Sequence, residues 1–573
     1  MPRRTERRRA TSVSVALVLA AFAHCIAVGW GRWGDWLIDT GRELELPRRM
    51  LEGERLYSDL RFYYGPLAPY VNAALYRAFG VRVEVLAVAG IASAALMCGA
   101  LWMLARRLAG VVAATLVALA FVYACAFPHL HPDSGIFNFA LPYTFSATYG
   151  IVAATWSLLF LVVHLERGGL ASLAGSAALL AVTALAKLEP FFAIAAAHLV
   201  FLVTGGLPRR REVVAYSGAA AAAAAVYGAL ALRSGAGNVW RGVTALMNDG
   251  SRFFVRAIMG LDDPAGRVGD LAGAWAALAV ALGASAALAR WMARRPGSGS
   301  PRSWSAAVLA AALGLAVPWI GGADAVFAAA TPLAVAGTSV HAVRLAGRAR
   351  GRRAGRARLL TWVFAGACLV RIALRPSLVG YGFYLLAPFL VPLAVLLLRD
   401  LPRRIAPSRG ERRAIAAFGA GMLLATGMAA MRTSAVHYAA RDTPVTSSRG
   451  SIRVREPVAA SIVSYLGGLP PGARVLVVPQ SSALNFFGER RGADHMFSYL
   501  PMEFAHGEEA ELIARWSRTP PDLIVMASMD MRDFGAGRFG TDYARACGEW
   551  IERHYRPLPG PFVDRGILLA VPR

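Results

Sequence analysis

The sequence predicts a mainly α-helical, polytopic membrane protein of about 13 spans that ends in a small α/β domain. Hydrophobic residues make up 56% of the 573 residues and charged residues only 17%, whereas about a quarter of a soluble domain is charged. Apolar runs close to the length that crosses a bilayer recur up to residue 431. Arginines gather in every second connection between these runs. The net charge of +26 is also typical of nucleic-acid-binding proteins, but the hydrophobicity excludes that class.

The chain begins with a basic segment and an apolar run that we interpret as an uncleaved signal anchor. The run continues past the loose cleavage pattern Ala21-Phe22-Ala23, so cleavage is not expected. We expect a transmembrane part over 1–431 and a separate domain over 432–573. After the first run at 13–30, the predicted spans lie near 84–105, 109–127, 147–165, 170–187, 190–207, 213–232, 270–289, 304–320, 323–343, 359–376, 381–398 and 414–431.

The distribution of arginine predicts how these spans are oriented. The connections expected on the first side hold 28 arginines against five acids; they are 1–11, 106–110, 166–170, 207–213, 290–303, 344–359 and 399–413. Positively charged connections stay in the cytoplasm. We therefore predict a multi-pass protein of the plasma (inner) membrane with a cytoplasmic N-terminus. Thirteen spans then place the C-terminal domain outside the cytoplasm.

The C-terminal segment has a different pattern, with short apolar strands between polar helices. Pro-Pro pairs at 470–471 and 520–521 punctuate it. We predict helices at 456–467 and 541–555 and strands at 474–478, 522–527 and 566–571. This order is typical of a small α/β domain.

The first outer loop, 31–83, is long and rich in acids and arginines. Most of its residues are expected to be an ordinary solvated loop, but transporters and channels usually keep such loops short. A carboxylate here can act as a general base, and nearby cations can hold a phosphate. The loop therefore indicates a site at the outer membrane surface, with a lipid phosphate as the natural substrate.

Charged residues at the outer ends of two predicted spans form a second candidate set. Lys187, the only lysine of the chain, and Glu189 end the fifth span, and Arg371 and Arg375 end the eleventh. Charges at this depth are costly and tend to be functional, although a snorkelling pair or an interfacial anchor would also explain them. Because both sets fall on the side of the acid-rich loop, we expect one shared cavity.

The sequence indicates neither a metal nor a nucleotide. His129, His131 and Asp133 have a loose, proline-containing spacing, so we predict no metal site there. The chain lacks the phosphate-binding, dinucleotide-binding, zinc-protease and nucleophile-elbow motifs. No cofactor is expected; a divalent metal is conceivable but has no support.

Three segments of the first loop carry a recognisable pattern: 39–46 (DTGRELEL), 50–59 (MLEGERLYSD) and 64–70 (YGPLAPY). They resemble the first periplasmic loop of the GT-C glycosyltransferases, and Asp39, Arg42 and Glu45 reproduce its D-x-x-R-x-x-E pattern. The similarity is closest to the branch of protein O-mannosyltransferases, lipid A aminoarabinose transferases and bacterial polyprenyl-phosphate-dependent transferases. The chain departs from relatives with two adjacent acids because Thr40 follows Asp39, so a paired-acid mechanism is not indicated.

This resemblance implies transfer of a sugar from a polyprenyl-phosphate donor to an extracytoplasmic hydroxyl on a glycan, lipid or protein, with inversion. Asp39 would be the general base, with Glu45 as a second catalytic residue. The donor phosphate would bind Arg42, Lys187, Arg371 and Arg375, and the substrates would contact Glu189, Tyr64 and Tyr381. The expected partners are thus the donor, membrane lipids and the acceptor, and not nucleic acid.

Two other functions remain open from the sequence. A transporter or flippase of lipid-linked saccharides would explain the spans and buried charges, but it explains the acid-rich loop and the outer domain poorly. A non-catalytic assembly subunit is the third possibility.

Overall fold

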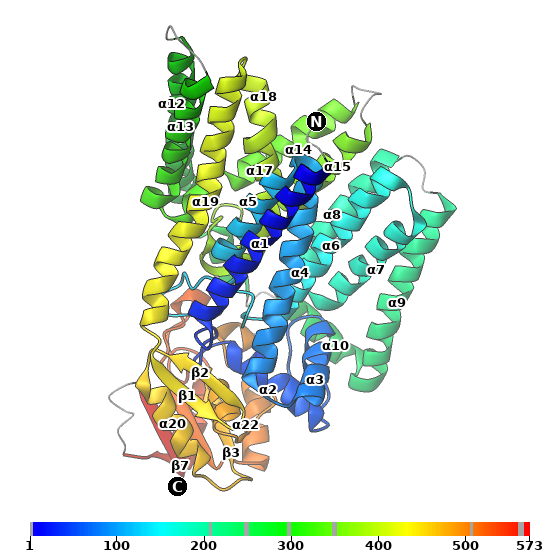
Figure 1. Cartoon of the computed structure of the whole chain (residues 1–573). Helices are drawn as coiled ribbons and strands as arrows, with labels where there is room; N and C mark the ends of the chain where they lie inside the picture. Colours follow the sequence, from blue (N-terminus) through cyan, green and yellow to red (C-terminus); the bar gives the residue numbers. More distant parts are fainter. Residues whose placement is uncertain are drawn as a thin grey trace.

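The structure is a computed structural model that describes residues 4–205, 209–245, 251–294, 300–346, 352–504, 508–559 and 566–573. Long helices form a bundle, and the strands gather with short helices at one end of it (Figure 1). The helices of the bundle are α1 (Arg4–Gly29), α4 (Val83–Ala109), α5 (Val111–Phe121), α6 (Phe145–Arg167), α7 (Leu170–Ala186), α8 (Leu188–Gly205), α9 (Arg210–Ser234), α12 (Pro264–Arg294), α13 (Ser300–Gly321), α14 (Ala330–Ala346), α15 (Arg352–Leu369), α17 (Leu390–Val395) and α19 (Arg409–Ala439).

The predicted fold class is confirmed: the chain is a multi-pass, mainly α-helical membrane protein with a small α/β region. Within the described residues, nine helices are long and apolar enough to cross a membrane, or ten if the bent segment Leu378–Ile405 is one span. The count is lower than the expected 13 for physical reasons. The apolar helices Val111–Ala126 and Leu170–Ala186 are short, and α15 carries four arginines in its first two turns. The predicted basic connections 207–213, 290–303 and 344–359 lie partly outside the described residues.

The first loop folds into two short helices, α2 (Thr40–Leu51) and α3 (Leu67–Phe79), which lie at the same end of the bundle as the strands (Figure 1). Ten of the 12 residues of α2 are buried, charged ones included. The loop predicted to be mostly solvated is therefore a packed layer between the membrane part and the α/β region.

The α/β region begins after α19, which continues past residue 431 to Ala439. β1 (Thr443–Ser447) and β2 (Gly450–Val454) form an antiparallel hairpin. Five further described strands make a mixed sheet in the order β4-β3-β5-β7-β6, in which β3 is parallel to β4 and β5. Their bounds are β3 (Arg474–Val478), β4 (Arg491–Gly492), β5 (Leu523–Ala527), β6 (Tyr555–Pro557) and β7 (Ile567–Pro572).

All five elements predicted for the C-terminal segment are present. The two helices are α20 (Pro457–Gly467) and α23 (Arg545–His554), and the three strands are β3, β5 and β7. The hairpin, β4, β6, α21 (Ala483–Phe487) and α22 (Glu508–Arg518) were not expected. β1 (TPVTS) and β2 (GSIRV) hold few apolar residues, and β4 has only two residues, so a search for apolar runs does not find them.

Alternation along β3 explains how the sheet joins the bundle. Val475 and Val477 belong to the core that is continuous with the membrane part, whereas Leu476 and Val478 belong to a second core with Trp516. Successive side chains of a strand point to opposite faces. One face of the sheet therefore packs towards the membrane part and the other is covered by the helices of the domain.

Close backbone packing fixes α2 against the α/β region. A Cβ added to Gly41 would lie 2.0 Å from the backbone nitrogen of Ala483, at the start of α21. Trp36 Nε1 donates to Glu456 Oε2 (3.0 Å), and Arg49 Nη1 donates to the Asp494 carbonyl (2.6 Å). The first loop thus has a fixed position relative to the α/β region.

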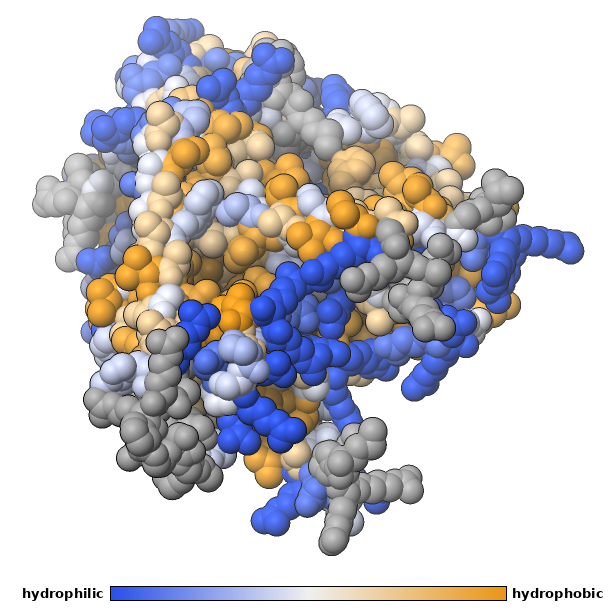
Figure 2. Space-filling model, turned by 90° about the horizontal axis from the view of Figure 1, so that it is seen from above, coloured by the Kyte–Doolittle hydropathy of each residue, from blue (hydrophilic) through white to orange (hydrophobic). Residues whose placement is uncertain are grey.

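The two ends of the bundle differ in their side chains. The N-terminus lies at the end opposite the strands (Figure 1). Seen from that side, hydrophilic side chains gather over the face, around hydrophobic ones between the helices (Figure 2). α6 runs from the loop end to Arg167 at the other end; its 23 residues span about 34 Å, close to the thickness of a bilayer core.

Candidate functional site

Three cations and three carboxylates meet where the bundle touches the first loop, and we call them the charged cluster. They come from the start of α2, from the break between α7 and α8, and from the turn after α15. Its members are Asp39, Arg42, Glu43, Lys187, Glu189 and Arg371. The structure thus unites the loop carboxylate with charges from the two predicted span ends.

Asp39 caps the N-terminus of α2 with a backbone φ of +24°, a region that side-chain-bearing residues rarely adopt. The turn that leads to it is closed by the Asp35 amide, which donates to Thr40 Oγ1 (2.8 Å). Arg42 Nη1 lies 2.7 Å from Asp39 Oδ1. The Asp39 side chain keeps 27% exposure, against 5% for Glu43. Of these two neighbouring carboxylates, Asp39 is therefore the one that a substrate can reach.

Arg42 and Glu43 hold this corner against α6. Arg42 donates to the Tyr143 carbonyl (2.6 Å) and to Glu43 Oε1 (3.3 Å). Glu43 Oε2 accepts from the amide of Phe145, the first residue of α6, where the helix dipole favours negative charge. Burial raises the pKa of the Glu43 carboxyl, and Arg42 and the Phe145 amide oppose that rise. Glu43 thus acts as a positioning group for Arg42.

Lys187 is buried at the C-terminal cap of α7, where backbone extended at φ −158° separates α7 from α8. Its ammonium lies 2.9 Å from Glu189 Oε2 and donates to the Tyr143 hydroxyl. Four aromatic rings surround it, with the nitrogen between 4.6 and 5.9 Å from their centroids: Tyr64, Tyr143, Tyr381 and Tyr384. Such cation–π contacts stabilise a desolvated cation.

Arg371 completes the cluster from the turn after α15. It forms an ion pair with the second oxygen of Glu189, and its guanidinium carbon lies 4.9 Å from the centroid of the Tyr381 ring. Glu189 is therefore shared by Lys187 and Arg371, which leaves this half of the cluster with a net charge of +1. The half formed by Asp39, Arg42 and Glu43 has a net charge of −1. A half with a net positive charge thus lies beside a half that carries an accessible carboxylate.

Tyrosines connect the two halves. Tyr143 accepts from Arg42 through its carbonyl and from Lys187 through its hydroxyl. The Tyr64 ring lies 4.6 Å from the Lys187 nitrogen and 6.0 Å from the Arg42 guanidinium carbon. Tyr384 donates to Glu189 Oε2 (3.2 Å). The geometry therefore couples the position of Asp39 to that of Lys187.

Two predicted site residues lie apart from the cluster. Glu45 is buried against Arg48 (2.6 Å) and Arg449 (3.5 Å), so it faces the α/β region rather than Asp39. The sequence pattern groups Glu45 with Asp39, but the helical turn of α2 directs them to different sides. Arg375 is exposed, and in the described part of the chain no contact of its side chain joins it to the cluster. Neither residue therefore lies in the charged cluster.

Sequence reasoning missed three groups of the site: Glu43, Tyr143 and Tyr384. Glu43 is one of seven acids in the loop, and only the fold shows that it meets α6. Tyr143 and Tyr384 stand near predicted membrane surfaces, where tyrosines usually serve as anchors. Four segments that are far apart in the sequence must meet to place four tyrosines around one lysine, and no local sequence pattern predicts that.

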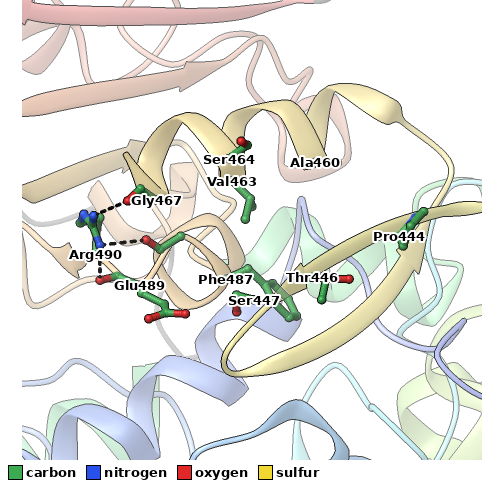
Figure 3. A pocket seen from close by; sticks show the side chains of 11 residues that line it. Pro444, Thr446, Ser447, Ala460, Val463, Ser464, Gly467, Phe487, Glu489 and Arg490 are labelled. Atoms are coloured by element: carbon green, nitrogen blue, oxygen red, sulfur yellow. Dashed lines mark hydrogen bonds between the residues drawn. The ribbon is translucent and has the colours of Figure 1, made fainter. Parts of the chain in front are cut away.

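A cavity lies elsewhere, between β1, α20 and α21 of the α/β region (Figure 3). Its charged side chains are already engaged: Arg490 donates to the carbonyls of Gly467, Gly488 and Glu489, and Glu489 accepts from Ser448. Because these groups serve the local fold, this cavity of about 560 Å³ is a weaker candidate than the charged cluster.

Among the described residues, no three histidine, cysteine, aspartate or glutamate side chains gather as a metal-binding group. His129 packs its ring against His437 (centroids 5.2 Å apart) and Tyr438 (5.8 Å). Its amide donates to Ser434 Oγ (2.9 Å). His129 therefore joins the loop to α19.

Comparison with known proteins gives similarity in structure only. No protein-family model and no curated protein sequence matches the chain. The oligosaccharyltransferase of Archaeoglobus fulgidus, in complex with zinc and sulfate, is similar at a TM-score of 0.49 and 12% identity over 89% of this chain and 68% of that one. ArnT from Cupriavidus metallidurans in the apo state is similar at a TM-score of 0.48 and 15% identity over 98% and 97% of the two chains.

Proposed function

We propose that the protein is a membrane glycosyltransferase that moves a sugar from a polyprenyl-phosphate donor to an acceptor hydroxyl. The observation that carries this proposal is the charged cluster, in which a net-positive half lies beside an accessible carboxylate at the end of the bundle. The donor is amphipathic in the same way, with a phosphate at the interface and a chain for the membrane. The motif of the first loop, from Asp39 to Arg42, supports the same class of reaction.

In the proposed reaction the donor phosphate takes the place of Glu189 as the partner of Lys187 and Arg371. The donor is a phosphodiester with a charge of −1, whereas the released polyprenyl phosphate carries −1.5 to −2 near neutral pH. Fixed cations stabilise a charge that grows along the reaction more than they stabilise the ground state. Lys187 and Arg371 therefore favour departure of the phosphate.

Asp39 is proposed as the general base. The acceptor oxygen forms a bond to the anomeric carbon while the bond from that carbon to the phosphate oxygen breaks, and its electron pair leaves with the phosphate. The hydroxyl proton passes to Asp39, and attack opposite the leaving group inverts the configuration. Arg42 orients the Asp39 carboxylate through an ion pair of 2.7 Å. Removing a general base lowers the rate by about 10²–10⁴-fold.

The site is proposed to face away from the cytoplasm. The charged cluster and the α/β region share one end of the bundle, and the N-terminus with its arginines lies at the other (Figure 1). The positive-inside rule assigns the arginine-rich end to the cytoplasm. A glycan, lipid or protein at the outer surface of the membrane would then supply the hydroxyl.

The test measures both products in proteoliposomes that hold a radiolabelled polyprenyl-phosphate sugar and an envelope extract as acceptor. Wild-type protein should release one polyprenyl phosphate for each sugar transferred. The variant Asp39→Asn should lower both products at least about 100-fold. Asp59→Asn is the matched control, because Asp59 is an acid of the same loop that pairs with Arg55 at the surface; it should keep wild-type activity.

Other outcomes would contradict the proposal. A flippase would move the labelled donor across the bilayer without releasing polyprenyl phosphate. An assembly subunit would form neither product, and Asp39→Asn would then leave its partners' activity unchanged. Equal activity of Asp39→Asn and wild type, with both proteins folded, would remove Asp39 from the mechanism.

A further inference from the structure

A second cationic site lies at the opposite end of the bundle, where α6 and α8 end and α9 and α15 begin. It is a cavity of about 220 Å³ with a mainly polar lining, to which the apolar side chains Leu165, Phe201 and Leu202 also contribute. Among the described residues five arginines line it, against one glutamate, Glu212. They are Arg167, Arg209, Arg211, Arg353 and Arg356. Five like charges around one small cavity repel each other unless an anion lies between them.

Only some of these five arginines have partners within the described part of the protein. Glu212 caps α9 by accepting from the Arg209 amide (3.0 Å). Arg356 donates to the Phe201 carbonyl (2.7 Å) and to Thr204 Oγ1 (3.1 Å), so it has a structural role. Among the described residues no carboxylate pairs with Arg167, Arg211 or Arg353, and the Arg211 Nε is buried without a hydrogen-bond partner.

The position of the cavity at a membrane surface indicates which kind of ligand it binds. α6 begins at the charged cluster and ends at Arg167, so the cavity lies about one bilayer thickness from the cluster, at the other membrane surface. A cationic cavity between helix ends, with three apolar side chains in its lining, fits a phosphate headgroup whose chains lie between the helices. Basic pockets of this kind bind anionic lipids.

We propose that this cavity binds the phosphate headgroup of an anionic membrane lipid. The lipid neutralises Arg167, Arg211 and Arg353 and joins α6, α8, α9 and α15 at their cytoplasmic ends. The site is separate from the proposed catalytic centre, and it does not depend on the transferase assignment.

The experiment titrates delipidated full-length protein in neutral micelles with chain-labelled phosphatidylglycerol and follows anisotropy and thermal stability. The site variant is Arg211→Gln with Arg353→Gln, because neither side chain has a described partner whose loss would unfold the protein. The control is Arg403→Gln with Arg404→Gln, two exposed arginines of α18 (Leu401–Ile405) at the same end of the bundle.

The wild type should bind phosphatidylglycerol and not phosphatidylcholine. The site variant should bind about 30-fold more weakly, as expected for two lost cations near a membrane surface. The control should stay within about twofold. Equal weakening in both variants would show diffuse surface attraction and overturn the site. Protection by inorganic phosphate at the same concentration as the lipid would show a soluble anion instead, and would overturn the lipid assignment.

Discussion

The buried ion pair between Asp35 and Arg441 gives the sharpest prediction on stability. Arg441 lies just beyond α19, and Asp35 precedes α2. Arg441 Nη2 donates to Asp35 Oδ2 (3.0 Å), and Nη1 donates to the Gly34 carbonyl (2.5 Å). Both side chains are about 95% buried, at 5% and 6% exposure. The pair therefore clamps the end of the last span to the turn that carries Asp39.

Replacing Arg441 by methionine fills the space but leaves Asp35 buried without a counter-charge. Burial already raises the pKa of Asp35, and Arg441 is the main group that opposes this rise. Breaking a buried pair by removing one partner costs about 3–5 kcal/mol. We expect Arg441→Met to lose this much in free energy of unfolding, measured by thermal and denaturant unfolding in detergent.

The double variant Asp35→Asn with Arg441→Met separates charge from packing. Without the orphaned carboxylate it should recover part of the loss, a coupling of about 0.5–3 kcal/mol. Arg553→Met is the control, because Arg553 pairs with Glu549 on the exposed face of α23 and such pairs contribute little. A single variant as stable as wild type, or a double variant no more stable than the single, would refute the clamp.

Two other predictions concern charge at the site and at the domain. Lys187→Met should lower sugar transfer about 10²–10³-fold, because it removes a cation that stabilises the phosphate. Lys187→Arg should retain more activity. Equal transfer by Lys187→Met and wild type in the product assay would exclude Lys187 from phosphate stabilisation. Burial raises the pKa of Glu503 above its ordinary 4.5, against the opposing effect of Arg61. A raised carboxyl pKa contributes stability below pH 4.5 that is lost as pH rises through the folded-state pKa. Glu503→Gln should therefore show a smaller fall in Tm between pH 4.5 and 7 than wild type, and parallel pH profiles would contradict this.

The sequence was a good guide to the fold because the strongest signals were local. Long apolar runs predict the long helices, and short apolar runs predict β3, β5 and β7. The short helices at 111–126 and 170–186 show the limit of this reasoning. Hydropathy alone does not tell a helix that crosses the membrane from one that is buried within the bundle.

The site was predicted in part. A charge near the membrane is costly and can be recognised in the sequence, which explains why Lys187, Glu189 and Arg371 were found. In the structure Glu189 pairs with both cations. Glu45 was grouped wrongly because the motif spacing does not say which side of α2 faces the bundle. Tyr143 and Tyr384 were missed because their role depends on contacts between segments far apart in the chain.

The central claim is that the charged cluster binds the donor phosphate while Asp39 performs the chemistry. The most direct measurement compares polyprenyl-phosphate binding and single-turnover sugar transfer in the same preparation of Asp39→Asn. The account predicts binding at least as tight as in wild type, because Lys187 and Arg371 remain, together with transfer at least about 100-fold slower. Transfer at the wild-type rate, or loss of binding and transfer by the same factor, would contradict it.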